Sequence, residues 1–253
     1  MKKKQLKEVN TVHLLDQDAP FAIRESFNML RTNLMYTITE AQEGCPIYGI
    51  ASTHENTGKS TVIINLAVSF TQINKRVLMI DADMRCPTVH LYFGVEKNHV
   101  GLSEAISGIE HDVVMKDILP NLDLVTSGRI PPNPAELINS PRFVELLNQW
   151  KQEYDIIFID FPPIGIVSDA VAVCQSITGY IFAVRSGKNN AKAVKAAAES
   201  MERLGAKIVG LVLNDYNLKD ANGNRYAHSM YSNYSKYNSK YSADNSDKES
   251  SKK

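Results

Sequence analysis

The sequence lacks the long apolar segment of a membrane helix. No apolar run among its 253 residues approaches the length of roughly 18 residues at which a spanning helix is suspected. The basic start Lys2-Lys3-Lys4 leads into polar residues 5–10 rather than into the apolar core of a signal peptide. We therefore expect a cytoplasmic protein.

Cysteine and clustered histidine are also scarce. Cys45, Cys86 and Cys174 are the three cysteines, and none of them forms a C-x-x-C pair. The six histidines are scattered without the spacing of metal ligands. This pattern predicts ordinary thiols in a reducing compartment, with no disulfide framework, no zinc site and no redox cofactor.

An excess of one charge is missing as well. The 28 lysines and arginines balance the 28 aspartates and glutamates, so we expect no nucleic-acid partner from net charge. Hydrophobic residues make up 43% of the chain, which is enough for one large core. Composition thus favours a soluble enzyme domain.

The most informative segment is ASTHENTGKSTVIINLA, residues 51–67. The apolar run Ile47–Ala51 predicts a buried strand, and an apolar helical pattern follows Thr57-Gly58-Lys59-Ser60-Thr61. This is the setting of a phosphate-binding P-loop, in which backbone N–H groups face phosphate, Lys59 reaches the β/γ-phosphates and the Ser60 hydroxyl ligates Mg²⁺. The full pattern has glycine where Thr53 stands, and GKST alone is also compatible with a solvated turn and a helix N-cap.

Two further strands deliver acidic residues at their ends. The segment RVLMIDADMRCP, 76–87, places Asp81 and Asp83 after four apolar residues, and YDIIFIDFPP, 154–163, ends a longer apolar strand at Asp160. Each aspartate alone is also compatible with a turn that ends a strand. Because ligands bind outside the carboxyl ends of parallel strands, the three segments together predict one Mg-nucleotide site.

Strand and helix patterns alternate along the chain, which predicts an α/β fold with a doubly wound, mostly parallel sheet. Ser140 is a candidate N-cap. Besides the segments above, helices are expected over 26–41, 103–106, 141–150 and 191–204, and strands over 122–126, 180–185 and 207–213. Residues 88–127 otherwise look variable, and 127–137 look rich in turns.

We expect three parts: an N-terminal extension over 1–19, the P-loop domain over 20–217 and a disordered tail over 218–253. The tail has almost no aliphatic residues, so it cannot bury enough apolar surface to order itself. It nevertheless carries five of the eleven tyrosines, Tyr226, Tyr231, Tyr234, Tyr237 and Tyr241. Composition alone is equally compatible with a sticky low-complexity tail or with a segment that stacks on nucleic-acid bases.

These motifs together resemble the bacterial tyrosine kinases that regulate capsule and exopolysaccharide production, in the Firmicutes form with a separate cytoplasmic kinase chain. The resemblance rests on the P-loop, a D-x-D-x-R motif followed by Pro, a D-x-P-P motif and the tyrosine tail. It extends to S-G-x-x-P-P-N-P-x-E-L at 127–137 and V-R-S-G-K at 184–188. It implies a P-loop fold of the MinD/ParA type.

The resemblance also implies a Mg-ATP-dependent kinase that phosphorylates the five tail tyrosines in a neighbouring subunit. Within that comparison Thr57–Thr61 bind the nucleotide, Lys59 is the catalytic phosphate-binding lysine and Asp81 is the proposed base for the tyrosine hydroxyl. The implied metal ligands are Ser60, Asp83 and Asp160. A phenol has a pKa near ~10 and its proton leaves late, so Asp81 orients the hydroxyl more than it deprotonates it.

The implied partners are a membrane-spanning activator, or polysaccharide co-polymerase, that recruits the chain to the inner face of the membrane, a cognate tyrosine phosphatase, and further copies in a ring. The family's interface motif Glu-x-x-Arg-x-x-Arg appears here as Glu25, Asn28 and Arg31, so one of its two arginines is absent. A weaker ring is the expected consequence.

Two other readings stay open. A ParA- or MinD-like positioning ATPase has a similar fold, but it carries a signature lysine where His54 stands and has no tyrosine tail. A nucleotide-poor adaptor of the polysaccharide machinery is the second, because Glu55 and Asn56 stand where the kinases usually have Pro and Gly. Whether this loop weakens ATP binding is left open by the sequence.

Overall fold

The computed structural model describes residues 14–16, 18–38, 44–97, 99–164 and 173–216. Contacts divide the chain into one unit over 1–214, which holds all the elements below, and a second over 215–253. The tail over 218–253, with its five tyrosines, lies outside the described residues. Its disorder and the proposed domain bounds therefore remain predictions.

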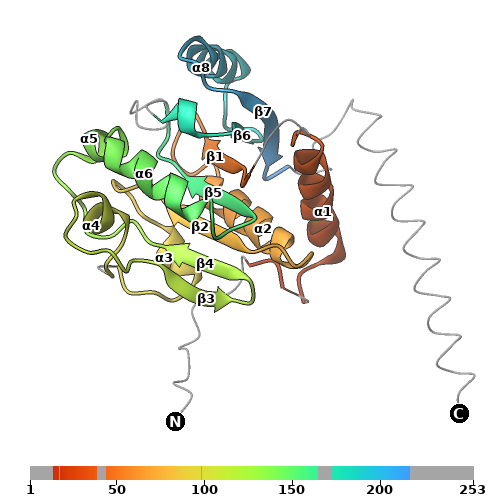
Figure 1. Cartoon of the computed structure of the whole chain (residues 1–253). Helices are drawn as coiled ribbons and strands as arrows, with labels where there is room; N and C mark the ends of the chain where they lie inside the picture. Colours follow the sequence, from red (N-terminus) through yellow and green to blue (C-terminus); the bar gives the residue numbers. More distant parts are fainter. Residues whose placement is uncertain (1–13, 17, 39–43, 98, 165–172, 217–253) are drawn as a thin grey trace, which may run out of the picture. The chain divides into compact units, whose positions relative to one another are not determined.

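A central sheet organises the first unit (Figure 1). Its order is β3-β4-β2-β5-β1-β6-β7, and every neighbouring pair is parallel except β3 with β4. This confirms the doubly wound, mostly parallel α/β fold. The strands are β1 (Ile47–Ala51), β2 (Val77–Asp81), β3 (Met115–Leu119), β4 (Leu122–Val125), β5 (Ile156–Asp160), β6 (Gly179–Arg185) and β7 (Ile208–Asn214).

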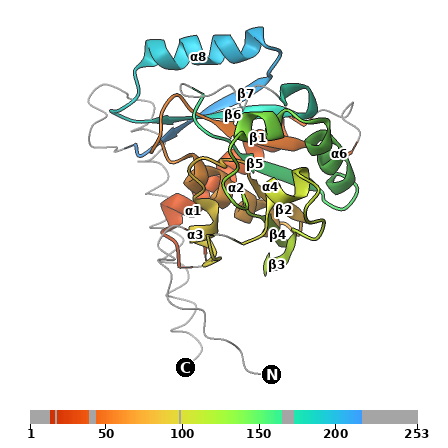
Figure 2. The same cartoon turned by 90° about the vertical axis from the view of Figure 1, so that its left-hand side faces the viewer.

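Helices cover both faces of the sheet, as Figures 1 and 2 show. Side chains of α1, α2 and α3 share one buried cluster with the sheet, and those of α4, α5, α6 and α8 share the other. The helices are α1 (Phe21–Met35), α2 (Lys59–Thr71), α3 (Val89–Tyr92), α4 (Leu102–Ile106), α5 (Pro134–Ile138), α6 (Pro141–Trp150) and α8 (Ala191–Arg203), with a 3₁₀ turn at Cys174–Ser176.

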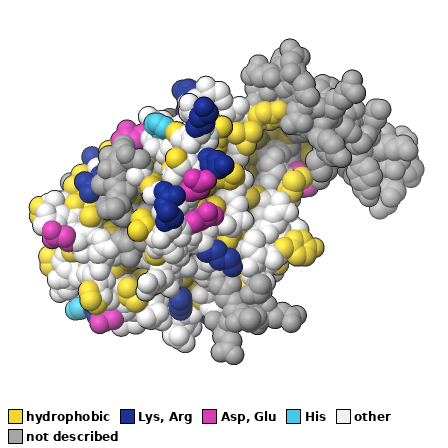
Figure 3. All heavy atoms as spheres, turned by 90° about the horizontal axis from the view of Figure 1, so that it is seen from above, with side chains coloured by type: hydrophobic (Ala, Val, Ile, Leu, Met, Phe, Trp, Pro, Cys, Tyr) yellow, Lys and Arg dark blue, Asp and Glu magenta, His cyan; other side chains and the backbone are white. Residues whose placement is uncertain are grey.

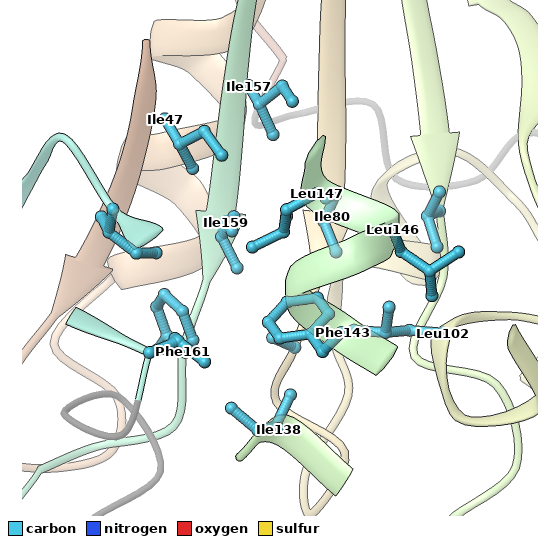
Figure 4. Close-up of a cluster of buried hydrophobic side chains, with 14 of the residues drawn as sticks. Ile47, Ile80, Leu102, Ile138, Phe143, Leu146, Leu147, Ile157, Ile159 and Phe161 are labelled. Carbon is cyan, nitrogen blue, oxygen red and sulfur yellow. The ribbon is translucent and has the colours of Figure 1, made fainter. Parts of the chain in front are cut away.

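Strands β1, β2 and β5 are buried along their whole length because helices pack on both sides of them. Figure 4 shows Phe143 of α6 lying among side chains of the strands and of α4 and α5. Burying each large apolar side chain contributes roughly 1.5–3 kcal/mol before the cost of ordering it. These strands therefore give the site a rigid base.

The start and end of the first helix differ from the prediction. Helix α1 covers Phe21–Met35 rather than 26–41, and it begins directly after Pro20. Phe21 and Ile23 are 39% and 49% exposed, so the first turn adds little to the buried apolar stripe on which the prediction relied. The helix over 141–150 was predicted correctly, and Ser140 Oγ accepts a hydrogen bond from the Phe143 N–H at 3.3 Å.

Three elements were not predicted: α3, β3 and α5. All are short, and β3 is a half-exposed edge strand held only by β4 within the described sheet. Elements of four or five residues give too few repeats for a periodic pattern to be recognised.

None of the helices that the structure describes has the length and apolar character needed to cross a membrane. Seen from above, lysines and arginines lie among aspartates and glutamates rather than in a patch of one sign (Figure 3). On α8 one such pair, Lys195 and Glu199, lies 3.8 Å apart.

Candidate active site

The order of the sheet places the three predicted motifs side by side. Strand β5 lies between β1 and β2, and Asp160 is the register partner of Asp81 on one side and of Ile50 on the other. Ile80 and Ile159 face the α6 cluster, so the next residue on each strand points to the opposite face, which α2 and α3 cover. The carboxylates of Asp81 and Asp160 therefore point toward the start of α2.

The P-loop lies between β1 and α2. Gly58 has φ +84°, in the left-handed region that favours glycine, and a Cβ there would come within 2.0 Å of Asn214 Nδ2. Asn56 has φ +55°, which asparagine tolerates better than most residues. Lys59 follows as the first residue of the 13-residue helix α2 and is only 7% exposed. A helix N-terminus of this kind favours bound anions.

Ser60 and Asp160 are joined directly. The Ser60 hydroxyl donates to Asp160 Oδ2 at 2.5 Å and lies 2.9 Å from Thr88 Oγ1. Burial raises the pKa of Asp160 to about 6, while the Lys59 charge and the Ser60 hydrogen bond oppose the rise. Its other oxygen, Oδ1, is buried and has no hydrogen-bond partner among the described residues.

Asp81 and Asp83 lie beside this pair in different settings. Asp81 is fully buried, and its two oxygens accept hydrogen bonds from the N–H groups of Asp83 and Val89, both at 3.1 Å. Burial first, and then the charges of Asp160 and Asp83, raise the pKa of Asp81 well above its ordinary value. Asp83 accepts from the Cys86 N–H at 3.0 Å, and burial raises its pKa although Lys59 lowers it.

The residues at this site fit a magnesium ion. Mg²⁺ in nucleotide sites is held by one or two carboxylates, phosphate oxygens and water. Ser60 Oγ and the unpaired Asp160 Oδ1 are oxygens of that kind, and a buried unpaired carboxylate oxygen is costly without a partner. Within the described part of the chain no three His, Cys, Asp or Glu side chains group to hold a metal by themselves.

Five residues at the site were given no role by the sequence analysis. Thr88 lies against Ser60, and Tyr92 Oη lies 2.7 Å from Thr61 Oγ1. Asn214 donates to the Thr57 carbonyl at 2.9 Å, while Arg185 and Asn189 contact the loop from the end of β6. Arg185 ends the predicted strand over 180–185 and lies in the V-R-S-G-K motif, and Asn214 directly follows the predicted strand over 207–213. Those positions at the carboxyl ends of strands were the signal available for them.

The predicted interface residues lie on α1, which is separate in the sequence from the strand ends that form the site. Asn28 Nδ2 donates to Glu25 Oε1 at 2.8 Å, and the Arg31 guanidinium donates to the Ser69 carbonyl of α2. Arg31 therefore ties α1 to α2 within the subunit. The five tail tyrosines lie outside the described residues.

The fold and the arrangement of these residues define a P-loop nucleotide-binding domain. The family model described as "CobQ/CobB/MinD/ParA nucleotide binding domain" matches residues 48–236. Tyrosine-protein kinase CpsD of Streptococcus agalactiae is 34% identical over 214 residues, which cover 84% of this chain and 90% of that protein. Tyrosine-protein kinase YwqD of Bacillus subtilis (strain 168) is 37% identical over 193 residues, 75% of this chain and 80% of the relative.

Solved structures agree with the sequence relatives. The kinase domain of Escherichia coli tyrosine kinase ETK superimposes with a TM-score of 0.74 at 33% identity, covering 80% of this chain and 79% of that one. The chain therefore belongs to the CobQ/CobB/MinD/ParA nucleotide-binding family and, within it, to the bacterial tyrosine kinases. This confirms the resemblance identified from the motifs.

Proposed function

We propose that this chain is a Mg-ATP-dependent protein-tyrosine kinase that phosphorylates the tail tyrosines of a neighbouring copy and regulates capsular or exopolysaccharide synthesis and export. The observation that carries the proposal is the meeting of the P-loop with Asp81 and Asp160 on adjacent strand ends, joined by the bond from Ser60 to Asp160. The likeness to kinases at 34–37% identity supports the choice of reaction.

In this proposal Ser60, Asp83 and Asp160 hold Mg²⁺, which supplies charge neutralisation on the phosphate oxygens when bound. The loop from Thr57 to Thr61 binds the β- and γ-phosphates through its N–H groups. The Lys59 ammonium stabilises the charge that develops as the bond between the γ-phosphorus and its bridging oxygen breaks. The tyrosine oxygen forms the new bond to phosphorus as ADP leaves, and its proton passes late in the transfer to the Asp81 carboxylate.

Asp81 is assigned to the incoming tyrosine hydroxyl, as an orienting acceptor more than as a strong base. Its oxygens are held by two backbone N–H groups, which fix the direction of the carboxylate. Catalysis of phosphoryl transfer depends mainly on positioning and on stabilised charge, so a fixed acceptor suits this role.

The partners belong to the same proposal. They are a membrane-spanning activator or polysaccharide co-polymerase that brings the chain to the inner face of the cell membrane, a cognate tyrosine phosphatase, and further copies of the chain in a ring. Glu25 and Arg31 of α1 are the proposed ring contacts, and the missing second arginine at Asn28 favours a weaker assembly.

The test measures two products in one reaction. Purified protein is incubated with Mg-ATP, with and without the cytoplasmic peptide of a candidate activator, and ADP and phosphotyrosine are both quantified. A kinase yields phosphotyrosine on the tail in proportion to ADP. A positioning ATPase yields ADP without phosphotyrosine, an adaptor yields neither, and either result would overturn the proposal. A variant with all five tail tyrosines changed to Phe is the control for site assignment.

A further inference from the structure

The turn between β6 and α8, residues 185–189, contacts the P-loop at three points, one of which is the 3.3 Å approach of Asn189 Nδ2 to His54 Nδ1. The Asn189 carboxamide donates from Nδ2 to Thr53 Oγ1 at 2.9 Å, and the Arg185 guanidinium donates to the Asn56 carbonyl at 2.8 Å. Thr53 and Asn56 flank the part of the loop that departs most from a glycine-rich sequence. The turn therefore supports the loop where its own sequence is atypical.

The side chain of Asn189 is itself fixed at both ends. Its Oδ1 accepts from the Arg185 N–H at 2.6 Å while Nδ2 donates to Thr53, so the carboxamide has one orientation that satisfies both partners. The backbone N–H groups of Lys188 and Asn189 also donate to the Arg185 carbonyl, at 3.3 and 3.2 Å. The hydrogen bonds within the turn thus hold the Asn189 Nδ2 donor in place against the P-loop.

Thr53 connects the turn to the P-loop. It is only 6% exposed, directly follows the fully buried Ser52, and its hydroxyl lies 2.7 Å from His54 Nδ1. A loop whose N–H groups bind phosphate must turn its carbonyls and side chains away from the ligand. Each carbonyl or side chain that a neighbouring residue already holds in that direction lowers the entropy cost of ordering the loop when the ligand binds. Because Thr53 and Asn56 are both held from outside, the segment that leads into the proposed phosphate-binding residues Thr57–Thr61 is fixed by the turn.

We propose that Asn189 is a positioning residue that holds the P-loop through Thr53 in the shape that binds the nucleotide phosphates. This rests on the proposed function in assigning nucleotide to the loop. Asn189 acts on affinity for nucleotide, and it acts through the Thr53 hydroxyl rather than by touching the ligand.

A double-mutant cycle on the full chain tests this proposal. The dissociation constant of Mg-ADP is measured by calorimetry for the wild type, Asn189→Ala, Thr53→Val and the double variant. Each single change is expected to weaken binding about five- to twentyfold, the loss typical of one hydrogen bond to a buried group. The double variant is expected to bind no more weakly than the weaker single variant. Losses that multiply, or binding within twofold of wild type in a folded Asn189→Ala protein, would overturn the proposal.

The neighbouring Asn190 supplies a matched control. Its side chain accepts from the Lys192 N–H at 2.8 Å and caps α8. Asn190→Ala is expected to lower the melting temperature and leave the Mg-ADP affinity within twofold. If it weakens binding as much as Asn189→Ala does, general loss of the turn explains the effect and the proposal fails.

Steady-state kinetics separate this inference from the kinase assignment. In Asn189→Ala the KM for Mg-ATP is expected to rise with the dissociation constant, while kcat at saturating nucleotide stays within about threefold, because bound phosphates then order the loop themselves. A wild type that binds Mg-ADP but makes no phosphotyrosine would refute the kinase and leave the role of Asn189 intact. A wild type that binds no nucleotide would refute both.

Discussion

The Ser60 hydroxyl donates to Asp160 Oδ2 at 2.5 Å, which joins the first turn of α2 to the carboxyl end of β5. These residues are 100 positions apart in the sequence, and parallel pairing of β5 with β1 brings them together. The bond occupies one carboxylate oxygen and leaves Oδ1 buried without a partner in the described chain. The Ser60 hydroxyl and the Asp160 carboxylate, which we propose as Mg²⁺ ligands, thus already lie together in the fold.

Lys59→Met is expected to lower tail phosphorylation more than ~100-fold while the fold stays intact. The helix N-terminus remains, but the cation that stabilises charge in the transition state is lost, and removal of one preorganised donor typically costs this much. Phosphotyrosine is measured by mass spectrometry and folding by circular dichroism. Lys75→Met, at an exposed lysine after α2, is the control. Activity near wild type in Lys59→Met would move the site elsewhere.

The three aspartates are expected to differ in what their loss removes. Asp83→Asn and Asp160→Asn should raise the Mg²⁺ concentration needed for activity, because both are assigned to the metal. Asp81→Asn should retain nucleotide binding and lose turnover. If it instead lost Mg-ATP binding and kept its turnover per bound nucleotide, the roles should be exchanged.

Asp81→Asn also needs a stability measurement. The carboxylate accepts two N–H donors, so an amide there turns its own NH₂ group toward one of them. The lost acceptor is expected to cost about 1–3 kcal/mol in the free energy of unfolding, and at neutral pH the removal of a buried carboxylate whose pKa is raised by burial offsets part of that cost. Turnover is therefore normalised to folded, nucleotide-bound protein.

The pKa of Asp160 predicts how stability depends on pH without metal. An unfolded aspartate holds its proton only below about pH 4, whereas folded Asp160 holds it up to about 6. The folded state therefore binds more protons between these values, and its stability falls as pH rises through this range. Asp160→Asn has no such loss, so at pH 7 it should be more stable than wild type by up to about 3 kcal/mol.

Urea unfolding in EDTA at pH 4.5, 6 and 7.5 measures this difference. The advantage of Asp160→Asn over wild type should grow with pH, because the variant lacks the ionisation of Asp160 and because loss of that charge also removes one cause of the raised pKa of Asp81. A variant that is less stable than wild type at pH 7.5 would contradict the raised pKa.

Phe143→Ala is expected to lower the free energy of unfolding by about 3–5 kcal/mol. Phe143 is fully buried between α6 and the sheet, and its removal leaves a cavity in a packed core (Figure 4). Glu145→Ala on the same helix is the control, because its exposed ion pair with Arg142 contributes little. Equal effects of the two changes in urea unfolding would mean that the packing of Phe143 does not stabilise the core.

The sequence predicted the long elements and the strand ends well, for a physical reason. Strands β1, β2 and β5 are continuous apolar runs that end in Gly, Asp or Pro motifs, so both their position and their polar ends are visible in the sequence. That Asp81 and Asp160 lie side by side next to the strand that leads into the P-loop then follows from the parallel pairing of β1, β5 and β2. The start of α1 was harder to predict because the apolar side chains of its first turn are partly exposed.

Contacts that depend on tertiary structure were not predictable. Thr88 meets Ser60 because α3 packs beside α2, and no local pattern marks a four-residue helix. Asn189 meets Thr53 from 136 residues away, and a turn asparagine is normally explained by the turn itself. Such partners are specified by the fold and not by their neighbours in the chain.

The most direct test of the account mixes two proteins, each of which lacks one part of the proposed reaction. A Lys59→Met protein supplies an intact tail but no transfer site, and an active protein with its five tail tyrosines changed to Phe supplies the site but no acceptor. If the tail is disordered, as the sequence predicts, a segment of 15 to 25 residues would reach roughly 20–30 Å, enough to extend to an adjacent subunit. With Mg-ATP, under conditions where wild type phosphorylates its tail, we predict phosphotyrosine on Tyr226, Tyr231, Tyr234, Tyr237 or Tyr241 of the Lys59→Met chain. A Lys59→Met tail that stays unmodified would contradict transfer between copies.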